Sequence, residues 1–433
     1  MILCMKRYRV IWSRWRQGRI EGDMNSIEKF FKSRVRFDRN EFAGAFGDIG
    51  TDFPLIMGMI LACGIDGSSV FIAYGAMQIL TALIYGIPMP VQPLKMVALL
   101  AITQKLGGGV IFGGGLVIGA IMLLFTLTGI IEYLGKIIPL AVIRGVQMGL
   151  GLQLAMLSLK EYIPSGSTAG LILAGIAFII TIALLGNRRF PPALIIIALG
   201  VIYGIIITYD PALFGKLWLP PLPKFSIPTF DDMATGLIVL AIPQIPLSLG
   251  NSIYASSQIV KDYFPDKNIG VRKIGFTYSL MNIISPLFGG VPVCHGSGGL
   301  VGHYTFGART GGSIVIYGIF YLVMGVLTGG NINALAGIFP KPLLGVILLF
   351  EGLALLNLAK DRAAIKNEFI ITLIVALFAI CIPYGYLTGM ATGSVIYHLF
   401  KGKTIALPDP SSVLPLKNSE CAMHDATTRL NRS

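Results

Sequence analysis

Two proline-containing segments, Pro88-Met-Pro-Val-Gln-Pro93 and Val291-Pro-Val-Cys-His-Gly296, decide how this chain folds. Each leads into a short apolar stretch, at 94–106 and 295–307. A helix of about 13 residues covers only about 20 Å at 1.5 Å per residue, whereas the hydrocarbon core of a bilayer is ~30 Å thick. About five extended residues before it, at about 3.3 Å each, supply the missing length. The pattern predicts two broken membrane crossings, each a short strand followed by a half-helix.

The two broken crossings occupy equivalent positions in two halves of the chain. They lie 202 residues apart (Pro292 minus Pro90), and Gly47-Asp48 and Gly250-Asn251 repeat at nearly the same offset, 203 (250 minus 47). A helix that begins near the membrane midplane presents free N–H groups and the positive end of its dipole there, which suits an anion. Paired half-helices in two repeats therefore predict the binding site of a transporter.

The composition indicates an integral membrane protein. Of the 433 residues, 54% are apolar and 13% are charged, whereas soluble globular proteins carry about 25% charged residues. The net charge of +13 falls in alternate connections between apolar segments, so it indicates orientation in the membrane and not nucleic-acid binding. The five cysteines are scattered and match neither a disulfide framework nor a metal site. We expect no metal, no other cofactor and no nucleic-acid partner.

The apolar segments fall into two sets of seven, and the third segment of each set is short. In the first half they lie at 42–62, 69–87, 94–106, 113–133, 138–158, 168–186 and 192–208. In the second half they lie at 233–257, 272–289, 295–307, 313–329, 338–358, 368–383 and 386–400. Because seven is odd, the second set enters the membrane from the opposite side. The predicted fold is an all-α polytopic membrane protein of fourteen segments in two inverted repeats, with short strands before half-helices 3 and 10.

The distribution of basic residues predicts the domains and their orientation. We expect a basic cytoplasmic arm at 1–40, a first repeat at 41–207, a connecting loop at 208–232, a second repeat at 233–401 and a disordered cytoplasmic tail at 402–433. With the arm inside, every connection rich in Lys and Arg also lies inside, as the positive-inside rule requires. The protein is expected in the cell membrane with both termini cytoplasmic. Residues 1–24 resemble neither a signal peptide nor a spanning helix, and Met24 is an alternative start.

Two carboxylates lie in the otherwise apolar first segment. Asp48 and Asp52 occur in Phe46-Gly-Asp-Ile-Gly-Thr-Asp-Phe-Pro54 and could share one helix face. Poor solvation and mutual repulsion would favour a proton on at least one of them, and protonation would offset the charge of an incoming anion. We therefore predict that they couple transport to protons. The alternative is that they cap loose backbone N–H groups of an irregular helix.

The first half-helix opens with Gln92, Pro93 and Lys95. Proline in a first helical turn costs little, because its missing N–H would have been unpaired. Lys95 is an ammonium group at membrane depth, which is expensive unless it meets an acidic partner or an anion. It is a candidate substrate ligand. The alternatives are a salt bridge with Asp48 and an extension of the side chain toward the cytoplasmic surface.

The second half-helix opens with Cys294-His-Gly-Ser-Gly-Gly299. Gly296 and Gly298 let backbone N–H groups approach a ligand closely, and the side chains of His295 and Ser297 can donate hydrogen bonds. Cys294 adjoins this site, where we expect it to pack as a small residue and not to act as a nucleophile. No base or oxyanion arrangement accompanies Ser297, and we do not expect an enzyme.

The eighth segment adds the neutral amides Gln244 and Asn251, which can donate to an oxyanion without burying a charge. The alternative is that they join neighbouring helices. We expect Arg144 to meet lipid headgroups or backbone carbonyls. Glu351 is an intramembrane carboxylate to which the sequence gives no role.

Five motifs resemble those of the molybdate transporters related to the sulfate permease family, over about residues 38–400. They are Phe42-Ala-Gly-Ala-Phe-Gly-Asp-Ile-Gly-Thr51, Gly86-Ile-Pro-Met-Pro-Val-Gln-Pro-Leu-Lys95, Ile143-Arg-Gly-Val-Gln147, Pro243-Gln-Ile-Pro246 and Pro292-Val-Cys-His-Gly-Ser-Gly-Gly-Leu300 with Phe306-Gly-Ala-Arg309. The resemblance implies a core and a gate domain with substrate between segments 3 and 10. The motif positions that it marks are Gly47, Asp48, Thr51, Gln92, Pro93, Lys95, Gln244, Asn251, His295, Gly296, Ser297 and Gly298.

The resemblance also implies the function. We expect a secondary active transporter that imports molybdate, and tungstate with it, by alternating access, coupled to protons or sodium. Membrane lipids surround it, and a homodimer follows by family analogy. The alternatives are a transporter of sulfate or another oxyanion and a nucleobase permease, because cavity size and donor placement are not fixed by the sequence.

Overall fold

In the computed structural model of the chain, the two proline segments pair with each other. β1 (Gln92–Pro93) and β2 (Val293–Cys294) form a two-stranded antiparallel sheet with Gln92 opposite Cys294. The strands expected before the half-helices are therefore present. The structure describes residues 28–165, 168–184, 192–207, 222–223, 225–327, 339–382 and 385–400. Most of the expected arm, of the connecting loop and of the tail lies outside the described residues.

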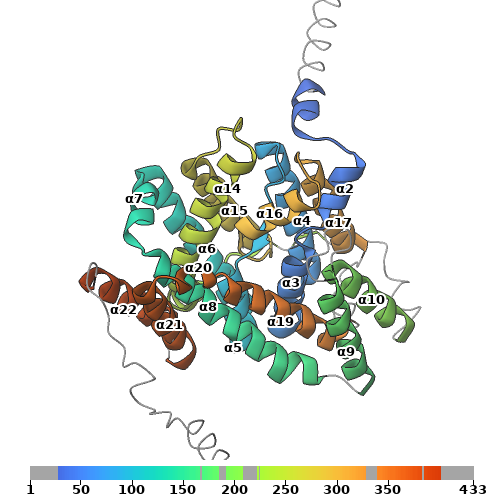
Figure 1. The fold of residues 1–433 in the computed structure, drawn as a ribbon. Coiled ribbons are helices and arrows are strands. Elements are labelled where there is room, and N and C mark those ends of the chain that lie inside the picture. Colours follow the sequence, from blue (N-terminus) through green and yellow to red (C-terminus); the bar gives the residue numbers. More distant parts are fainter. Residues whose placement is uncertain are drawn as a thin grey trace, which may run out of the picture.

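Helices occupy the predicted apolar segments in both halves (Figure 1). In the first half they are α2 (Arg39–Ala45), α3 (Ile49–Cys63), α4 (Gly67–Tyr85), α5 (Lys95–Gln104), α6 (Gly108–Thr128), α7 (Ile130–Ile137), α8 (Leu140–Leu157), α9 (Thr168–Ala183) and α10 (Pro192–Ile207). A π-helical turn (Ser158–Tyr162) and a 3-10 turn (Ile163–Ser165) extend α8.

In the second half the helices are α12 (Phe230–Gly236), α13 (Ile242–Leu247), α14 (Ser256–Tyr263), α15 (Val271–Leu287), α16 (Ser297–Thr305), α17 (Gly312–Leu327), α19 (Lys341–Asn357), α20 (Lys360–Ala363), α21 (Lys366–Cys381) and α22 (Gly385–Leu399). Two π-helical turns, Leu237–Ala241 and Ser248–Ala255, join α12, α13 and α14 into one continuous helical run. A π-helical turn inserts an extra residue into a helix and often marks a functional region.

The first predicted segment, 42–62, is not a single helix. It is divided into α2 and α3, which are bent by 41° relative to each other. The break falls at Gly47, whose backbone packs directly on the backbone of Gly302 in α16: an added Cβ at Gly47 would lie 2.7 Å from Gly302 C. Only glycine on both helices permits this approach. The break therefore brings the beginning of α3 against the second half-helix.

Several helices are long and apolar enough to cross a membrane. Within the described residues these are Gly67–Tyr85, Gly108–Thr128, Leu140–Ser165, Phe230–Tyr263 and Lys341–Ala363, and the bent pair α2 and α3 qualifies as one more. The half-helix α5 is shorter, as predicted, and so are α9, α17 and α21. The chain is a helical membrane protein, and the inverted relation of its two halves remains a prediction.

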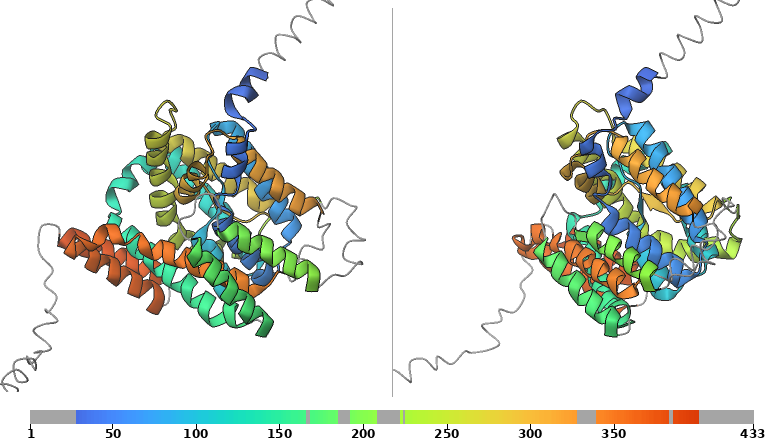
Figure 2. Two further views of the ribbon diagram at one scale, coloured as in Figure 1. Left: turned by 45° about the vertical axis from the view of Figure 1, so that its right-hand side comes forward. Right: turned by 90° about the vertical axis from the view of Figure 1, so that its right-hand side faces the viewer.

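The helices form two bundles that lie side by side (Figures 1 and 2). In the core bundle α4 packs on α17, and α6 packs on α12 and α15. In the gate bundle α8 packs on α19 and α21, and α21 on α22, while α9 packs on α19. The bundles meet where α3 contacts α19 and where α5 contacts α8. The strand pair and both half-helices belong to the core bundle, close to this boundary.

Candidate functional site

Both half-helices begin directly after the strand pair. Leu94 precedes α5 and Gly296 precedes α16, both with extended backbone, and the N–H of Leu94 donates to the carbonyl of Pro292 at 3.0 Å. Because the strands are antiparallel and adjacent, the two helix N-termini start from the same small region. The fold thus brings together the two ends that the sequence predicts to face an anion.

The N-terminus of α5 is capped by another side chain. Oε1 of Gln244 accepts hydrogen bonds from the backbone N–H groups of Met96 at 3.0 Å and Val97 at 3.4 Å. Its Nε2 donates to Oγ of Ser248 at 2.9 Å. Gln244 is 2% exposed, so this cap is buried. In this structure the amide predicted to bind substrate joins two helices and uses N–H groups that an anion would otherwise meet.

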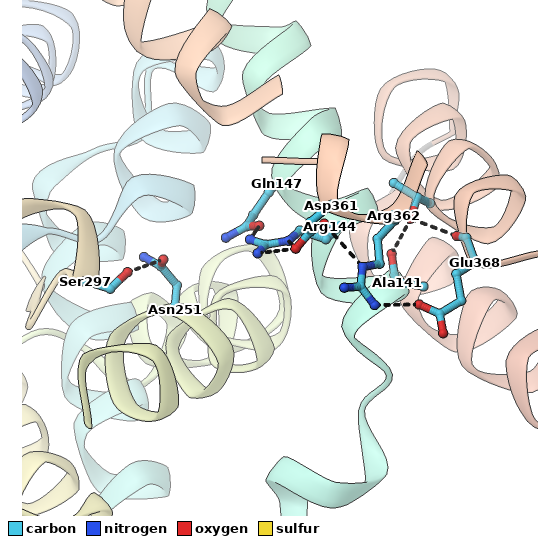
Figure 3. Close-up of polar contacts among 9 residues, drawn as sticks. Ala141, Arg144, Gln147, Asn251, Ser297, Asp361, Arg362 and Glu368 are labelled. Atoms are coloured by element: carbon cyan, nitrogen blue, oxygen red, sulfur yellow. Dashed lines mark hydrogen bonds and ion pairs between the residues drawn. The ribbon is translucent and has the colours of Figure 1, made fainter. Parts of the chain in front are cut away.

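The N-terminus of α16 is open. Among the described residues, no side chain is hydrogen-bonded to its first-turn N–H groups, and Oγ of Ser297 donates to Oδ1 of Asn251 at 2.9 Å (Figure 3). Gly298 is exposed, and an added Cβ there would meet nothing within 4 Å. Free N–H groups in a first helical turn carry the positive end of the helix dipole. Of the two half-helix ends, this one keeps its first-turn N–H groups free of a side-chain hydrogen bond among the described residues, and the Asp48 carboxyl group packs beside it.

Asp48 lies against the first turn of α16. Nε2 of Gln92 donates to its Oδ2 at 2.5 Å, and both side chains are buried. A Cβ at Gly299 would overlap the Asp48 carboxyl group, and one at Gly296 would overlap the Gln92 amide. Within the described part of the chain, Oε1 of Gln92 has no hydrogen-bond partner. The Asp48 side chain makes no hydrogen bond that caps α3. In this structure Asp48 therefore does not have the capping role that was its alternative.

Asp52 lies deeper, in a cluster of tyrosines. The hydroxyl groups of Tyr74, at 2.5 Å, and Tyr317, at 3.1 Å, both contact Oδ2 of Asp52, which is fully buried. The Tyr74 hydroxyl also contacts the carbonyl oxygen of Val91. A hydroxyl group has one proton to donate, so the Asp52 carboxyl group and the Val91 carbonyl oxygen compete for the Tyr74 proton. Asp52 and Asp48 therefore do not share partners, although they are one helical turn apart.

Lys95 forms an ion pair with Glu351 of α19. Oγ1 of Thr51 donates to the other carboxylate oxygen of Glu351 at 3.0 Å. The Lys95 and Glu351 side chains are 14% and 13% exposed, so the pair is largely shielded. Lys95 is therefore paired with Glu351, and not with Asp48 as one alternative had it. The partner is Glu351, a residue without a predicted role, whose one signal in the sequence is that it is a lone carboxylate in an apolar segment.

A cavity of about 240 Å³ lies between the two bundles at this point. Gly47, Asp48 and Thr51 line it from the core bundle, and Phe350 and Glu351 line it from the gate bundle. At roughly 30 Å³ per water, it has room for about eight water molecules, enough for an oxyanion with part of its hydration shell. Three predicted site residues therefore share one cavity with the acidic partner of Lys95.

Other predicted site residues lie in the strand pair and its supports. The ring of His295 is fully buried, with Nδ1 3.0 Å from the carbonyl oxygen of Pro90 and Nε2 2.8 Å from Oγ1 of Thr277. Both ring nitrogens are thus occupied within the protein. Pro93 and Cys294 are strand residues and are buried. In this structure these three residues hold the two half-helices together, and they do not line the cavity.

Arg144 also has a different partner from the one expected. Its guanidinium group bonds Oδ2 of Asp361, at 2.7 and 2.9 Å, and Oε1 of Gln147, at 2.9 Å (Figure 3). The expectation of lipid headgroups or carbonyls is therefore wrong for this structure. The contacts join α8 to α20 within the gate bundle. Within the described residues, no group of three or more His, Cys, Asp or Glu side chains could hold a metal ion.

Two half-helices that meet at a strand pair, beside a cavity between two helical bundles, define the class of protein. The fold is that of anion transporters of known structure. The transmembrane domain of the cyanobacterial bicarbonate transporter BicA is 18% identical, with a TM-score of 0.59 over 80% of this chain and 99% of that one. Murine SLC26A9 in its inward-facing state is 12% identical, with a TM-score of 0.62 over 85% of this chain and 69% of that one.

The sequence comparisons give the family. The family model "Molybdate transporter of MFS superfamily" matches residues 40–154 and 236–355, which include every predicted site residue. "Molybdate transporter 2" of Arabidopsis thaliana is 36% identical over 86% of this chain and 89% of its own length. "Molybdate transporter 1" of the same plant is 30% identical over 87% and 91%, and that of Chlamydomonas reinhardtii is 24% identical over 82% and 91%. The chain belongs to the molybdate transporter family.

Proposed function

We propose that this protein imports molybdate, and tungstate of the same charge and shape, across the cell membrane by alternating access. One observation carries the proposal: a member of the molybdate transporter family has a cavity between its bundles whose lining residues Asp48 and Glu351 contact the first turn of α16 and the Lys95 ammonium group. A tetrahedral dianion needs several hydrogen-bond donors and a positive charge to replace its hydration shell. This site offers both.

The donors that surround the site suggest how the oxyanion is held. The N–H groups at the start of α16, with the hydroxyl group of Ser297 and the amide of Asn251, would bind one side of the anion. Lys95 and Thr51 would approach from α5 and α3. Gln244, His295 and the strand pair would hold these groups in place from behind. The first-turn N–H groups of α5 contribute little, because Gln244 already uses them.

Asp48 supplies the coupling to protons in this proposal. Its carboxyl group lies against the same helix end that would receive the substrate, so an ionised Asp48 and a dianion would repel each other there. A proton on Asp48 removes that repulsion, and substrate and proton then bind together. Asp52 lies within the tyrosine cluster and supports the same helix from behind. Sodium in place of the proton is the alternative.

Alternating access would move the core bundle against the gate bundle. The cavity lies at the beginning of α3, on the side where the basic N-terminal arm joins the chain. With the arm and the tail in the cytoplasm, as the positive-inside rule predicts, this cavity opens inward. We propose that the described state is the inward-facing one. A homodimer is proposed by family analogy alone.

The test of the proposed function is uptake into liposomes that contain the purified protein. Molybdate is measured by elemental analysis, with and without an imposed pH gradient, and with sulfate or a nucleobase as competitor. We expect molybdate to accumulate, inward protons to drive it, and equimolar sulfate to leave most of the uptake intact. Abolition of uptake by equimolar sulfate would make sulfate the substrate, and a sodium gradient that drives uptake without a pH gradient would replace the proton.

A further inference from the structure

We propose that Glu351 is an internal anion that neutralises Lys95 in the empty transporter, and that the substrate oxyanion displaces it from Lys95. This inference rests on the proposed function, because it assumes that an oxyanion enters the cavity between the bundles. It assigns to Glu351 a role in substrate affinity and in the return of the empty carrier. Nothing in the family comparisons assigns such a role.

The contacts of Glu351 place it in competition with the substrate. One carboxylate oxygen is paired with Nζ of Lys95 and the other accepts from Thr51, and both of these residues are predicted substrate ligands. The carboxylate also lines the cavity itself. A carboxylate and an oxyanion present similar oxygen acceptors to an ammonium group. Glu351 thus occupies the same donors that the substrate needs.

The ion pair also joins the two bundles. Lys95 and Thr51 belong to α5 and α3 of the core bundle, whereas Glu351 belongs to α19 of the gate bundle. A sliding motion of one bundle against the other must break this contact. Breaking it without a replacement leaves a largely shielded charge unpaired, which is unfavourable. The pair therefore retains the empty core bundle in the position described here.

Substrate binding supplies the replacement. When a dianion pairs with Lys95, the lysine keeps a counter-ion while it leaves Glu351, and the core bundle can move. Glu351 keeps the hydroxyl group of Thr51 as a donor until the bundles separate, and it faces the water of the cavity. The exchange of one anion for another lowers the apparent affinity for substrate, because part of the binding energy is spent on displacing Glu351.

The decisive variant is Glu351→Gln, which keeps the shape and removes the charge. We expect the half-saturating concentration of molybdate to fall at least threefold, because Lys95 has no competing anion. We expect the maximal rate of net uptake to rise, because no ion pair between the bundles has to break before the empty core bundle returns. Exchange of labelled molybdate into liposomes preloaded with molybdate bypasses the empty carrier, so it should retain most of its rate.

The matched control is Glu132→Gln. Glu132 also forms an ion pair, with Arg272 at 2.9 Å, but both side chains are exposed and lie away from the cavity. This variant should leave half-saturation, net uptake and exchange unchanged. If Glu351 has a purely structural role, Glu351→Gln should lower the rates of net uptake and of exchange in parallel. The half-saturating concentration of molybdate would then be unchanged or raised, and that result would overturn the proposal.

A double-mutant cycle tests whether the competition acts through Lys95. In a Lys95→Gln background, Glu351→Gln should no longer improve affinity, since there is no ammonium group to release. An improvement that persists in this background would contradict displacement from Lys95. Substrate-induced thermal stabilisation in detergent gives the same affinities without transport. If Glu351→Gln is not recovered as folded protein, Glu351→Asp takes its place in the cycle, and its shorter side chain should weaken the competition and lower half-saturation by a smaller factor.

Failure of the proposed function is distinguishable from failure of this inference. A wild-type protein that carries sulfate in place of molybdate disproves the molybdate assignment, and the Glu351 cycle is then judged with sulfate. The displacement alone is disproved if the wild type and Glu351→Gln have the same half-saturating concentration of the oxyanion that is carried. If the wild-type protein neither binds nor carries molybdate, tungstate or sulfate, both proposals are wrong.

Discussion

Asp48 is the residue at which substrate charge and protein charge come closest together. It contacts Gln92 and the first turn of α16, and it lines the cavity. The proposed dianion would lie at the same helix end, so the charge on this one carboxyl group decides whether the site repels or accepts it.

Replacing Asp48 by Asn mimics the protonated carboxyl group. We expect uptake by Asp48→Asn to lose its stimulation at low external pH, because the site no longer needs a proton before the dianion can bind. Initial rates of molybdate uptake measured across a range of external pH check this. Asp262→Asn is the control, because Asp262 is exposed and its Oδ1 accepts a hydrogen bond from Gln258 at 2.8 Å. An unchanged rate with an unchanged pH profile removes Asp48 from coupling.

A second prediction at the residue scale concerns Gly47. A Cβ at this position would lie 2.7 Å from the backbone of Gly302, and a backbone cannot move aside as a side chain does. We expect Gly47→Ala to lower the free energy of unfolding by about 1–3 kcal/mol, the usual cost of overpacking. Thermal unfolding in detergent measures it. In Gly175→Ala an added Cβ meets nothing within 4 Å, so that control should be neutral or gain up to about 1 kcal/mol from helix propensity.

At the scale of elements, the two half-helices differ more than their equivalent positions in the sequence suggest. Gln244 caps α5, whereas no side chain caps α16. The cap comes from α13, so the first half-helix depends on the eighth segment for its stability. The asymmetry gives one half-helix a mainly structural N-terminus and leaves the other available to a ligand.

Removal of the cap should destabilise the protein. Gln244→Ala removes the acceptor of the backbone N–H groups of Met96 and Val97. It also removes the donor to the hydroxyl group of Ser248, and all of these groups are buried. We expect a loss of about 1–3 kcal/mol in the free energy of unfolding. Gln258→Ala, at an exposed position, should change stability by less than about 0.5 kcal/mol. Equal stabilities of the two variants in a denaturation series would show that the cap contributes nothing.

At the scale of the whole molecule, a second cavity lies between the bundles at their opposite end. It has a volume of about 390 Å³ and is lined by Leu100 and Gln104 from the far end of α5, and by Tyr386 and Leu387 from the start of α22. The cavity at Asp48 lies at the beginning of α3, and α3 and α5 end near each other around a third cavity. The two cavities between the bundles therefore lie toward opposite ends of α3 and α5.

Cysteine labelling separates the two sides. In a background with the five native cysteines replaced by alanine, Phe350→Cys should react with a membrane-impermeant thiol reagent from the cytoplasmic side only, and molybdate should slow the reaction. Leu387→Cys should react from the external side. Accessibility measured in inside-out and right-side-out vesicles checks this. Phe350→Cys that reacts only from outside would reverse the proposed orientation.

The sequence by itself predicted a helical membrane protein and the two strands that lead into short helices, and the structure contains both. Local patterns carry this information, because the length of an apolar segment, a proline and the position of a basic residue act on the chain where they stand. The strands before Leu94 and before His295, the short helices after them and the division into two halves all follow from such patterns. The irregular helix expected at 42–62 is broken at Gly47, and the contact of this break with α16 is something that the segment itself does not reveal.

Only the tertiary structure decided which polar groups meet. Lys95 and Glu351 are 256 residues apart, and Thr51 and Glu351 are 300 residues apart, so no spacing along the chain links them. In the same way, Gln244 and His295 had the right chemistry for a substrate ligand, yet in this structure their polar atoms bond other parts of the protein. The chain dictates where a charge enters the membrane, whereas the packing of helices against each other dictates what neutralises it.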